Sequence, residues 1–437
     1  MPIVALTLRS DSLRIAWRYA LLAALLHAVF ITASLVPRWR AQPLVVGDVI
    51  TYLRPAQNLV QHGTFSRSSE SPLRWEAYRT PGYPLAIAAT IVVFKDYRLV
   101  LYLAAATAGL ATFCAVWLGM QWGGRSAGHA AGITAALLPN SLGLSAMMLT
   151  DAVAGHLTLV WFCLLHITMT RANTRRVWVP LAGAIATVIA LQALKPTFNA
   201  ASLLIFAAAV LYRAIPRAWM MAGILVVSTF LLPMYLADRN LQDHGVFAPT
   251  LLDMETARNY LQARYEARRT GLTFESVVSR FQRDDRAAAD RLVTPQSPDG
   301  RLYLVRRQAV VGFVRNAPWG AASLMGSEMI RQLVAPQEFA LVVFRGSLST
   351  LERVLCSGLT AILLACALAG AVRLVRAGLA APVLLAATFV MFFLVGGAIS
   401  HHVGARLRFP ADMVMIPVAA IGLAGLQRKP EDGLTRA

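Results

Sequence analysis

Charged residues are scarce in this chain, and lysine is almost missing. Only 14% of the 437 residues are charged, whereas a typical soluble domain carries nearer ~25%. Hydrophobic residues make up 57%, the mean hydropathy is +0.56, and apolar runs close to ~20 residues long recur along the chain. The composition excludes a soluble globular protein. It predicts an all-α fold, a polytopic bundle of transmembrane helices.

The basic residues are almost all arginine, because Lys95, Lys195 and Lys429 are the only lysines. The formal net charge is +19. The functional interpretation is attraction to anionic lipid head groups or phosphates. The alternative is that arginine enrichment reflects genomic base composition alone. We expect membrane lipids among the partners and no nucleic acid.

Metal, disulfide and nucleotide motifs are also missing. The four cysteines, Cys114, Cys163, Cys356 and Cys366, fall in apolar runs without metal-ligand spacing, so we expect packing residues. The sequence has no HExxH or HxxE zinc motif, and the lack of a Walker motif argues against an ATP-driven pump. We therefore expect no metal and no cofactor, and leave a divalent cation open.

Ten apolar runs are candidate spans. They cover residues 19–36, 98–120, 127–149, 151–170, 177–194, 197–212, 218–236, 355–372, 378–399 and 409–426. The first run is long for a signal peptide and lacks an A-x-A cleavage site, so we interpret it as a retained anchor. The run 84–94 is too short to cross ~30 Å of hydrocarbon at about 1.5 Å per residue. We expect a juxtamembrane or re-entrant helix there.

The short basic loops test this count through the positive-inside rule. With a cytoplasmic N-terminus, the loops at Arg125, Arg171, Arg213 and Arg373 and the C-terminal tail all fall inside. Counting 84–94 as a full span would invert the later loops and break the rule for most of them. We therefore expect about ten spans with both termini cytoplasmic, in an integral protein of a bacterial inner (plasma) membrane.

The same topology collects several charged positions on the outer, periplasmic face. They are Asp48, Arg79, Asp151, Lys195, the segment 237–350 and the stretch from His401 to Arg408. Arg406 and Arg408 break the positive-inside rule there, and we interpret them as holding a phosphate, with His402 placed to contact it. The alternative is that the two arginines reach outer-leaflet head groups.

Residues 237–350 form the one substantial polar segment, with fifteen arginines and twelve acidic residues. Helix-like stretches and a turn at 295–300 predict a mainly helical soluble insertion with juxtamembrane helices. We divide the chain into an N-terminal membrane module at 1–236, this insertion, and C-terminal spans with a cytoplasmic tail at 351–437. The first outer loop, 37–97, holds the candidate catalytic residues.

The first outer loop puts Asp48, Arg79 and three tyrosines, Tyr52, Tyr78 and Tyr83, just beyond a span. Membranes tolerate such groups where they line a polar cavity or the interface, so we expect a site for a substrate that is part lipid and part anion. Asp48 can act as a general base toward an acceptor hydroxyl or amine. The alternative is that it caps the N-terminus of a helix.

Other ionisable residues of the spans also have two interpretations. Asp151 lies at the junction of two apolar runs, and either caps the following helix or shares a cleft with Asp48. Lys195 ends a span on the same face, and either reaches the interface or pairs with an anionic substrate. His156 and His166 are expected to be hydrogen-bonded core residues.

The first loop resembles that of a known family. It runs Gly47-Asp48-x3-Tyr52-x3-Ala56-x-Asn58-Leu59-x3-Gly63-Thr64-Phe65-Ser66, then Tyr78-Arg79-Thr80-Pro81-Gly82-Tyr83-Pro84. This pattern is similar to the first outer loop of polytopic GT-C glycosyltransferases, in the branch of protein O-mannosyltransferases and aminoarabinose transferases. Leu149-Thr150-Asp151 resembles that branch's second acidic position. Arg406-Leu407-Arg408-Phe409-Pro410 resembles its late basic-aromatic-proline motif.

Those enzymes use a polyprenyl-phosphate sugar that is made inside and flipped outward. The resemblance implies that Asp48 is the catalytic carboxylate and Asp151 a supporting acid. The implied candidates for binding the lipid phosphate are Arg79, Lys195, Arg406 and Arg408.

The sequence therefore predicts a membrane glycosyltransferase that moves a sugar from a polyprenyl phosphate to an outer-face lipid, glycan or protein acceptor. The leaving phosphate is an anion, so fixed cations and one carboxylate suffice for the transfer. The alternatives are a transporter of lipids or lipid-linked oligosaccharides, and a ligase or polymerase of lipid-linked glycans. A transporter is expected to show inverted repeats or broken helices, and neither is evident in the sequence.

Overall fold

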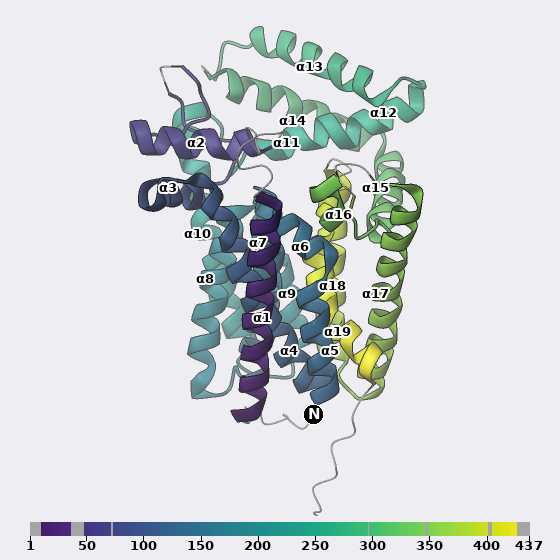
Figure 1. Ribbon diagram of the computed structural model, residues 1–437. Helices are drawn as coiled ribbons and strands as arrows, with labels where there is room; N and C mark the ends of the chain where they lie inside the picture. Colours follow the sequence, from purple (N-terminus) through teal and green to yellow (C-terminus); the bar gives the residue numbers. More distant parts are fainter. Residues whose placement is uncertain are drawn as a thin grey trace, which may run out of the picture.

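The computed structural model describes residues 10–35, 48–70, 73–295, 297–345, 348–400 and 404–425, and these residues form helices and no strand. The predicted all-α fold is confirmed. Helices running along one axis form a bundle, and a layer of further helices lies across one end of it (Figure 1). We call this end the insertion end. The first helix, α1 (Ser10–Leu35), begins at the opposite end, where α19 (Phe409–Ala424) also finishes.

Seven helices are long and apolar enough to cross a membrane, so the chain is an integral membrane protein. They are α1, η2 (Tyr97–Val100) with α4 (Leu101–Gly123), α7 (Thr150–Thr170), η3 (Arg175–Val177) with α8 (Trp178–Leu194), α10 (Ala218–His244), α17 (Thr350–Arg376) and α18 (Ala380–Ile399). Each of them covers most of one of the ten predicted spans.

The other three predicted spans are shorter helices. The span predicted at 127–149 contains most of α5 (Arg125–Leu137) and all of α6 (Pro139–Ser145). The span at 197–212 corresponds to η4 (Pro196–Ala200) and α9 (Ala201–Leu211), and the span at 409–426 corresponds to α19. The break before α6 falls at Pro139, because proline lacks the N–H that would continue a helix. The ten predicted spans thus appear as seven long helices and three segments built from shorter helices.

The short helix α19 lies among other helices rather than at the edge of the bundle. Its residues from Phe409 to Ile421 are all buried. Where it meets α17, a side chain at Gly370 would collide with the carbonyl of Val418, and one at Gly422 with the carbonyl of Cys366. Without these side chains the two backbones can touch, which is how membrane helices commonly associate.

The two histidines predicted to be core residues are hydrogen-bonded inside the bundle. His156 is fully buried, with its Nε2 2.7 Å from the hydroxyl oxygen of Ser141 and its Nδ1 3.2 Å from that of Thr107. His166 Nδ1 lies 2.6 Å from the hydroxyl oxygen of Tyr212. The four cysteines are free thiols, three of them buried.

Two helices of the first loop lie beside the insertion end of the bundle (Figure 1). They are α2 (Val49–His62) and α3 (Gly82–Phe94). The second covers the run 84–94 and is 13 residues long, which fits the predicted juxtamembrane helix. Gly82 lets the start of α3 approach the backbone of Ala193 near the end of α8. This contact brings the loop that carries Arg79 against the bundle.

The layer across the insertion end is built from α11 (Leu252–Thr256), the π-helix η5 (Ala257–Gln262), α12 (Ala263–Thr270), α13 (Phe274–Asp290) and α14 (Pro298–Asn316) (Figure 1). Two further helices connect it to the bundle: α15 (Pro318–Leu333), which packs on α18, and α16 (Phe339–Arg345), which packs on α6. The predicted helical insertion is therefore present. Its proposed start at residue 237 falls inside α10, which continues to His244.

Buried ion pairs hold the layer together. Arg258 of the π-helix donates to Asp285 of α13 at 2.9 Å, and Arg306 of α14 donates to Glu255 at 2.9 Å. Asp285 and both arginines are less than a tenth exposed. Pairing is what makes the burial of these charges tolerable, because an isolated buried charge is costly.

Candidate active site

Asp48 immediately precedes α2 at the insertion end of the bundle. It occupies the N-cap position, but its side chain makes no capping hydrogen bond. Its two carboxylate oxygens instead accept hydrogen bonds from Arg79 Nη2 at 2.7 Å and from Arg406 Nη2 at 3.0 Å. The interpretation of Asp48 as a simple helix cap is therefore wrong.

Asp151 lies in the first turn of α7 and faces the same cluster. One carboxylate oxygen accepts from Lys195 Nζ at 2.7 Å and the other from Arg406 Nε at 2.7 Å. The carboxylate is about 1% exposed, so its partners satisfy it completely inside the protein. Lys195 comes from the end of α8, where it pairs with a carboxylate of this chain.

Arg406, in the short helix η6 (Gly404–Arg406), connects the two carboxylates. Its guanidinium binds Asp151 through Nε and Asp48 through Nη2, so three distant parts of the chain meet at one group. The predicted convergence of these positions on one face is thus visible as a continuous chain of ion pairs. With Arg79 and Lys195 included, three cations face two carboxylates, which leaves one unit of positive charge.

Asp48 is the most exposed member of the cluster. The side chain of Asp48 is 38% exposed, whereas those of Arg79 and Arg406 are each 16% exposed. A substrate can therefore reach Asp48 directly, while Asp151 lies behind it. Burial alone would raise the pKa of Asp48, but the charges of Arg79 and Arg406 and their hydrogen bonds hold that pKa below its ordinary value.

Two of the three predicted tyrosines belong to this site. Arg79 Nη1 donates to the hydroxyl of Tyr52 at 3.3 Å, and its guanidinium lies 4.8 Å from the centre of the Tyr52 ring. Tyr83 packs edge-to-face on Tyr52 with ring centres 5.5 Å apart. Both rings are buried, so they form the wall that orients Arg79 rather than an exposed surface.

Tyr78 faces a different part of the molecule. Its hydroxyl donates to Asp299 of α14 at 3.2 Å, and its ring lies 4.5 Å from the guanidinium of Arg67. It therefore ties the first loop to the insertion. His402, the other predicted phosphate contact, lies outside the described residues.

Arg408 is also separate from the cluster, although it is two residues from Arg406. It is fully buried, and its Nε donates to Asp412 at 2.7 Å. Its Nη1 donates to the main-chain carbonyls of residues 332, 333 and 335, at 2.7 to 2.8 Å, around the end of α15. Arg408 therefore joins η6 and α19 to the insertion. It is not among the cations that we assign to the phosphate.

Two acidic residues that no sequence pattern singled out support the site. Glu76 Oε1 accepts from the main-chain N–H groups of Tyr78 at 2.7 Å and Arg79 at 3.1 Å, and so fixes the turn that presents Arg79. Asp412 holds Arg408, and this pair has the i, i+4 spacing of neighbours on a helix, which the sequence contained. Nothing in the local pattern distinguished Glu76 from a surface residue.

Among the described residues, histidine, cysteine, aspartate and glutamate do not form a group of three or more that could hold a metal ion. The arrangement instead offers fixed cations, one reachable carboxylate and an aromatic wall. Chemically, it can bind an anionic group on the cations while Asp48 accepts a proton beside it.

No protein-family model and no curated protein sequence matches the chain. Solved structures do. The archaeal oligosaccharyltransferase AglB from Archaeoglobus fulgidus, in complex with an inhibitory peptide and a dolichol-phosphate, is 14% identical with a TM-score of 0.51. That match covers 95% of this chain and 50% of AglB. The apo form of the Archaeoglobus enzyme is 15% identical with a TM-score of 0.52, covering 93% of this chain and 50% of that one.

A weaker match is ArnT from Cupriavidus metallidurans bound to undecaprenyl phosphate, which is 12% identical with a TM-score of 0.37. It covers 90% of this chain and 76% of ArnT. This chain spans about half the length of the oligosaccharyltransferase, and nearly all of it aligns there. The predicted resemblance is therefore confirmed at the level of architecture: the chain has the GT-C fold of polytopic membrane glycosyltransferases.

Proposed function

We propose that the protein is a membrane glycosyltransferase that moves a sugar from a polyprenyl-phosphate donor to an acceptor at the insertion end. The observation that carries this proposal is the cluster of Asp48, Arg79, Arg406, Asp151 and Lys195. It combines an excess of fixed positive charge with one carboxylate that a substrate can reach. These are the two elements that transfer from a phosphate leaving group requires.

In the proposed reaction, the acceptor oxygen or nitrogen attacks the anomeric carbon of the donor sugar. The bond between that carbon and the phosphate oxygen breaks, and its electron pair stays on the departing polyprenyl phosphate. Arg79, Arg406 and Lys195 stabilise the negative charge as it develops. Asp48 takes the proton from the acceptor, so the charges balance at every stage.

The ion pairs suggest how Asp48 becomes basic enough for this role. In the structure, Arg79 and Arg406 depress its pKa, which makes it a weak base. A donor phosphate binding to the same guanidiniums would share their charge and weaken their hold on the carboxylate. The pKa of Asp48 then rises when the donor is present, so the base is activated only in the loaded enzyme.

We place the insertion end on the periplasmic face of a bacterial inner membrane, with both termini in the cytoplasm. The basic loops support this orientation, because Arg125 begins α5 and Arg373 lies in the last turn of α17, both at the end of the bundle far from the insertion. On that face the donor arrives as a lipid, and the site needs no nucleotide pocket.

The solved oligosaccharyltransferase supports a polyprenyl-phosphate donor, because its structure contains a dolichol-phosphate. The apolar helices of this chain offer a lipid-facing surface next to the cluster. We propose a polyprenyl-phosphate sugar, an acceptor on the outer face and membrane lipids as the partners of this protein.

The test is lipid mass spectrometry of a strain that lacks the gene. We expect a polyprenyl-phosphate sugar to accumulate, and the wild-type gene to clear it. Asp48→Asn should fail to clear it, whereas Asp238→Asn should succeed, because Asp238 is exposed and its side chain accepts a hydrogen bond from Gln242 on its own helix, away from the cluster. An unchanged lipid profile would contradict the proposed function, and full complementation by Asp48→Asn would contradict the role of Asp48 alone.

A further inference from the structure

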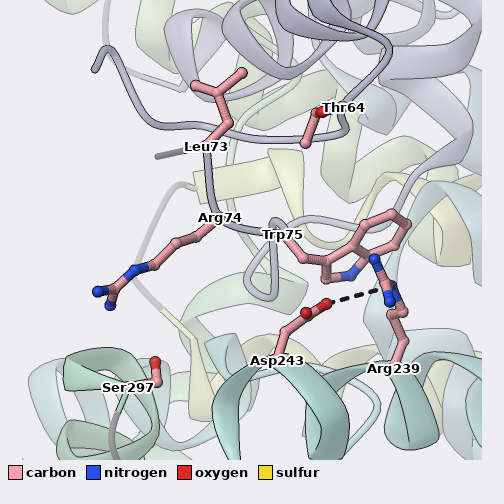
Figure 2. A pocket seen from close by; sticks show the side chains of 7 residues that line it. All are labelled: Thr64, Leu73, Arg74, Trp75, Arg239, Asp243 and Ser297. Carbon is pink, nitrogen blue, oxygen red and sulfur yellow. Dashed lines mark ion pairs between the residues drawn. The ribbon is translucent and has the colours of Figure 1, made fainter. Parts of the chain in front are cut away.

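A second polar site lies close to the cluster along the first loop. It is a pocket of about 330 Å³ between three segments of the chain (Figure 2). Thr64 and residues 73–75 line it from the first loop, Arg239 and Asp243 from the insertion end of α10, and Ser297 from the start of α14. None of these residues takes part in the ion-pair cluster around Asp48.

One buried histidine fixes the walls of this pocket relative to each other. His244 is 1% exposed, and its Nε2 donates to the main-chain carbonyl of Trp75 at 2.9 Å. With Nε2 as the donor, the neutral ring accepts the hydroxyl proton of Ser297 at Nδ1, where the two atoms are 2.8 Å apart. The three segments are therefore held in place without a ligand, and the pocket is preorganised.

The chief recognition group is Arg239, which is held flat against an aromatic ring. Its guanidinium carbon lies 4.8 Å from the centre of the Trp75 ring, and its Nε is 3.2 Å from Asp243 Oδ2. Trp75 is held in turn by an edge contact with Phe65 at 5.2 Å. Within the described part of the chain, the two terminal nitrogens of Arg239 have no hydrogen-bond partner, and its side chain is 38% exposed.

The chemistry of the pocket selects a class of ligand. Arg239 presents the free edge of its guanidinium, which suits a phosphate or carboxylate, and the exposed Arg74 adds a second positive charge at the rim, with its guanidinium directed away from Asp243 (Figure 2). Asp243 can accept hydrogen bonds from hydroxyl groups, and a sugar offers several of these beside its anionic group. The volume also exceeds what a single anion fills. A sugar that carries an acidic group meets all three conditions.

The pocket is near enough to the cluster to bind part of a reacting molecule. Trp75 precedes Arg79 by four residues, and four residues of extended chain reach at most about 14 Å. Glu76, between them, holds the turn that presents Arg79. Asp48 and Thr64 flank the two ends of the 14-residue helix α2, which is about 21 Å long, so a ligand in the pocket is separated from Asp48 by about the length of a short oligosaccharide.

We propose that this pocket binds an anionic saccharide, and that it is the subsite for the sugar portion of the acceptor. The proposal rests on the function proposed above, which left the acceptor open. It assigns Arg239 to the acidic group and Asp243 to sugar hydroxyls, whereas the donor phosphate belongs to Arg79, Arg406 and Lys195.

Binding can be measured without turnover, on the full-length protein in detergent micelles. The probes are a hexose monophosphate, the parent hexose and inorganic phosphate, each titrated and followed by saturation-transfer NMR of the ligand. We expect saturable binding of the hexose monophosphate that is about tenfold or more tighter than that of either fragment. Arg239→Gln should weaken it about tenfold or more, and Arg239→Lys should recover only part of the loss.

Two variants serve as controls for these titrations. Asp238→Asn, one residue away on the same helix and outside the pocket, should leave hexose monophosphate binding unchanged. Arg406→Gln separates the pocket from the donor cluster. A hexose monophosphate bound in the pocket should keep its affinity in this variant, whereas binding that Arg406→Gln weakens and Arg239→Gln does not belongs to the donor cluster and would overturn the proposal. A thermal unfolding curve for each variant shows whether it is folded.

Several results would overturn the proposal. They are no saturable binding by the wild-type protein, equal binding of inorganic phosphate, or no effect of Arg239→Gln. Competition by anionic phospholipid vesicles as strong as by the sugar phosphate would identify a lipid anchor instead. In a transfer assay, Arg239→Gln should raise the acceptor KM and leave the donor KM unchanged. A protein that binds the sugar phosphate but transfers nothing would contradict the enzyme function and leave the subsite standing.

Discussion

Arg406 is the residue on which the candidate site depends most. Its side chain contacts both carboxylates, and it comes from a part of the sequence more than 250 residues after Asp151. Asp48 and Asp151 differ mainly in exposure, at 38% and 1% of the side chain. Under the proposed function, the difference gives them separate tasks, with Asp48 facing the substrate and Asp151 fixing the orientation of Arg406.

Replacing Arg406 with glutamine is expected to weaken donor binding and slow transfer together. A charge-assisted hydrogen bond is worth roughly 1.5–3 kcal/mol, or about ten- to a hundredfold, and the contact strengthens as the phosphate departs. Arg406→Lys should recover only part of this, because an ammonium cannot bind both carboxylates in the same geometry. The measurement is a donor titration at saturating acceptor, and equal donor KM and kcat in all three proteins would remove Arg406 from the site.

The pH dependence of transfer should report the state of Asp48. Its pKa lies below the ordinary value, so the base is ionised at neutral pH and activity falls only in acid, as that pKa is approached. Arg79→Gln removes one of the two cations that depress the pKa. We therefore expect the acid limb of the kcat/KM profile to move to higher pH in this variant. The profile of Asp96→Asn, which alters an ion pair with Arg98 elsewhere in the loop, should stay in place.

The same depressed pKa has a consequence for stability. Folding stabilises the ionised carboxylate, so Asp48 contributes to stability above its unfolded-state pKa, and the contribution is lost as the pH falls through the lower folded-state value. Because Asp48 is more than a third exposed, solvent screens the pair and the contribution is small.

At the scale of elements, the short helix η6 is held from two sides. Arg264 of α12 donates to the carbonyl of Ser400 at 3.0 Å, and Arg408 donates to three carbonyls around the end of α15. Gln337, after α15, donates to Asp412 at 2.8 Å and so joins the same network. The insertion thereby sets the position from which Arg406 reaches the carboxylates.

Disrupting the ion pair between Arg408 and Asp412 is expected to lower the stability of the fold before it affects the transfer reaction. Arg408→Ala leaves Asp412 buried without its partner, which typically destabilises a protein by about 3–5 kcal/mol. Removing both charges, as in Arg408→Met with Asp412→Leu, should recover much of the loss because no unpaired charge remains. Thermal unfolding in detergent measures this. If Arg408→Ala were as stable as the wild type, the ion pair between Arg408 and Asp412 would not be buried in the membrane-embedded protein.

At the scale of the whole molecule, the bundle separates the site from the basic loops. The ion pairs place Asp48, Arg79, Asp151, Lys195 and Arg406 at the insertion end. The first turn of α5 and the last turn of α17 lie at the other end (Figure 1). The arrangement fits a protein that receives a lipid donor from within the membrane and an acceptor from the aqueous side.

This topology predicts opposite labelling at the two ends. A cysteine at Ser276, exposed on α13, should react with a membrane-impermeant maleimide in intact spheroplasts. A cysteine at Thr174, exposed in the turn between α7 and α8, should be protected until the cells are opened. Three of the native cysteines are buried, which keeps the background low. The reverse pattern would put the candidate site in the cytoplasm and contradict an outer-face reaction.

The sequence by itself determined the class of this protein and the identity of most of the site. Apolar runs matching the length of a bilayer require helices, whatever their neighbours, so the membrane bundle and its helical insertion could be predicted. The short basic loops then indicated which loops lie on the inner face. Because each span carries the chain to the other side of the membrane, the same count put five charged residues together on the outer face: Asp48, Arg79, Asp151, Lys195 and Arg406. Five charged positions could thus be grouped before any contact was known.

Only the tertiary structure decided which of these residues touch and which do not. Arg406 and Arg408 are two positions apart and look equivalent in sequence, yet one lies in the open cluster and the other is fully buried beside Asp412. Glu76 and His244 act through hydrogen bonds to main-chain groups, and only the folded chain brings those groups within reach. Hydrogen bonds depend on distances of a few tenths of an ångström between segments far apart in the chain, and local sequence patterns do not carry that information.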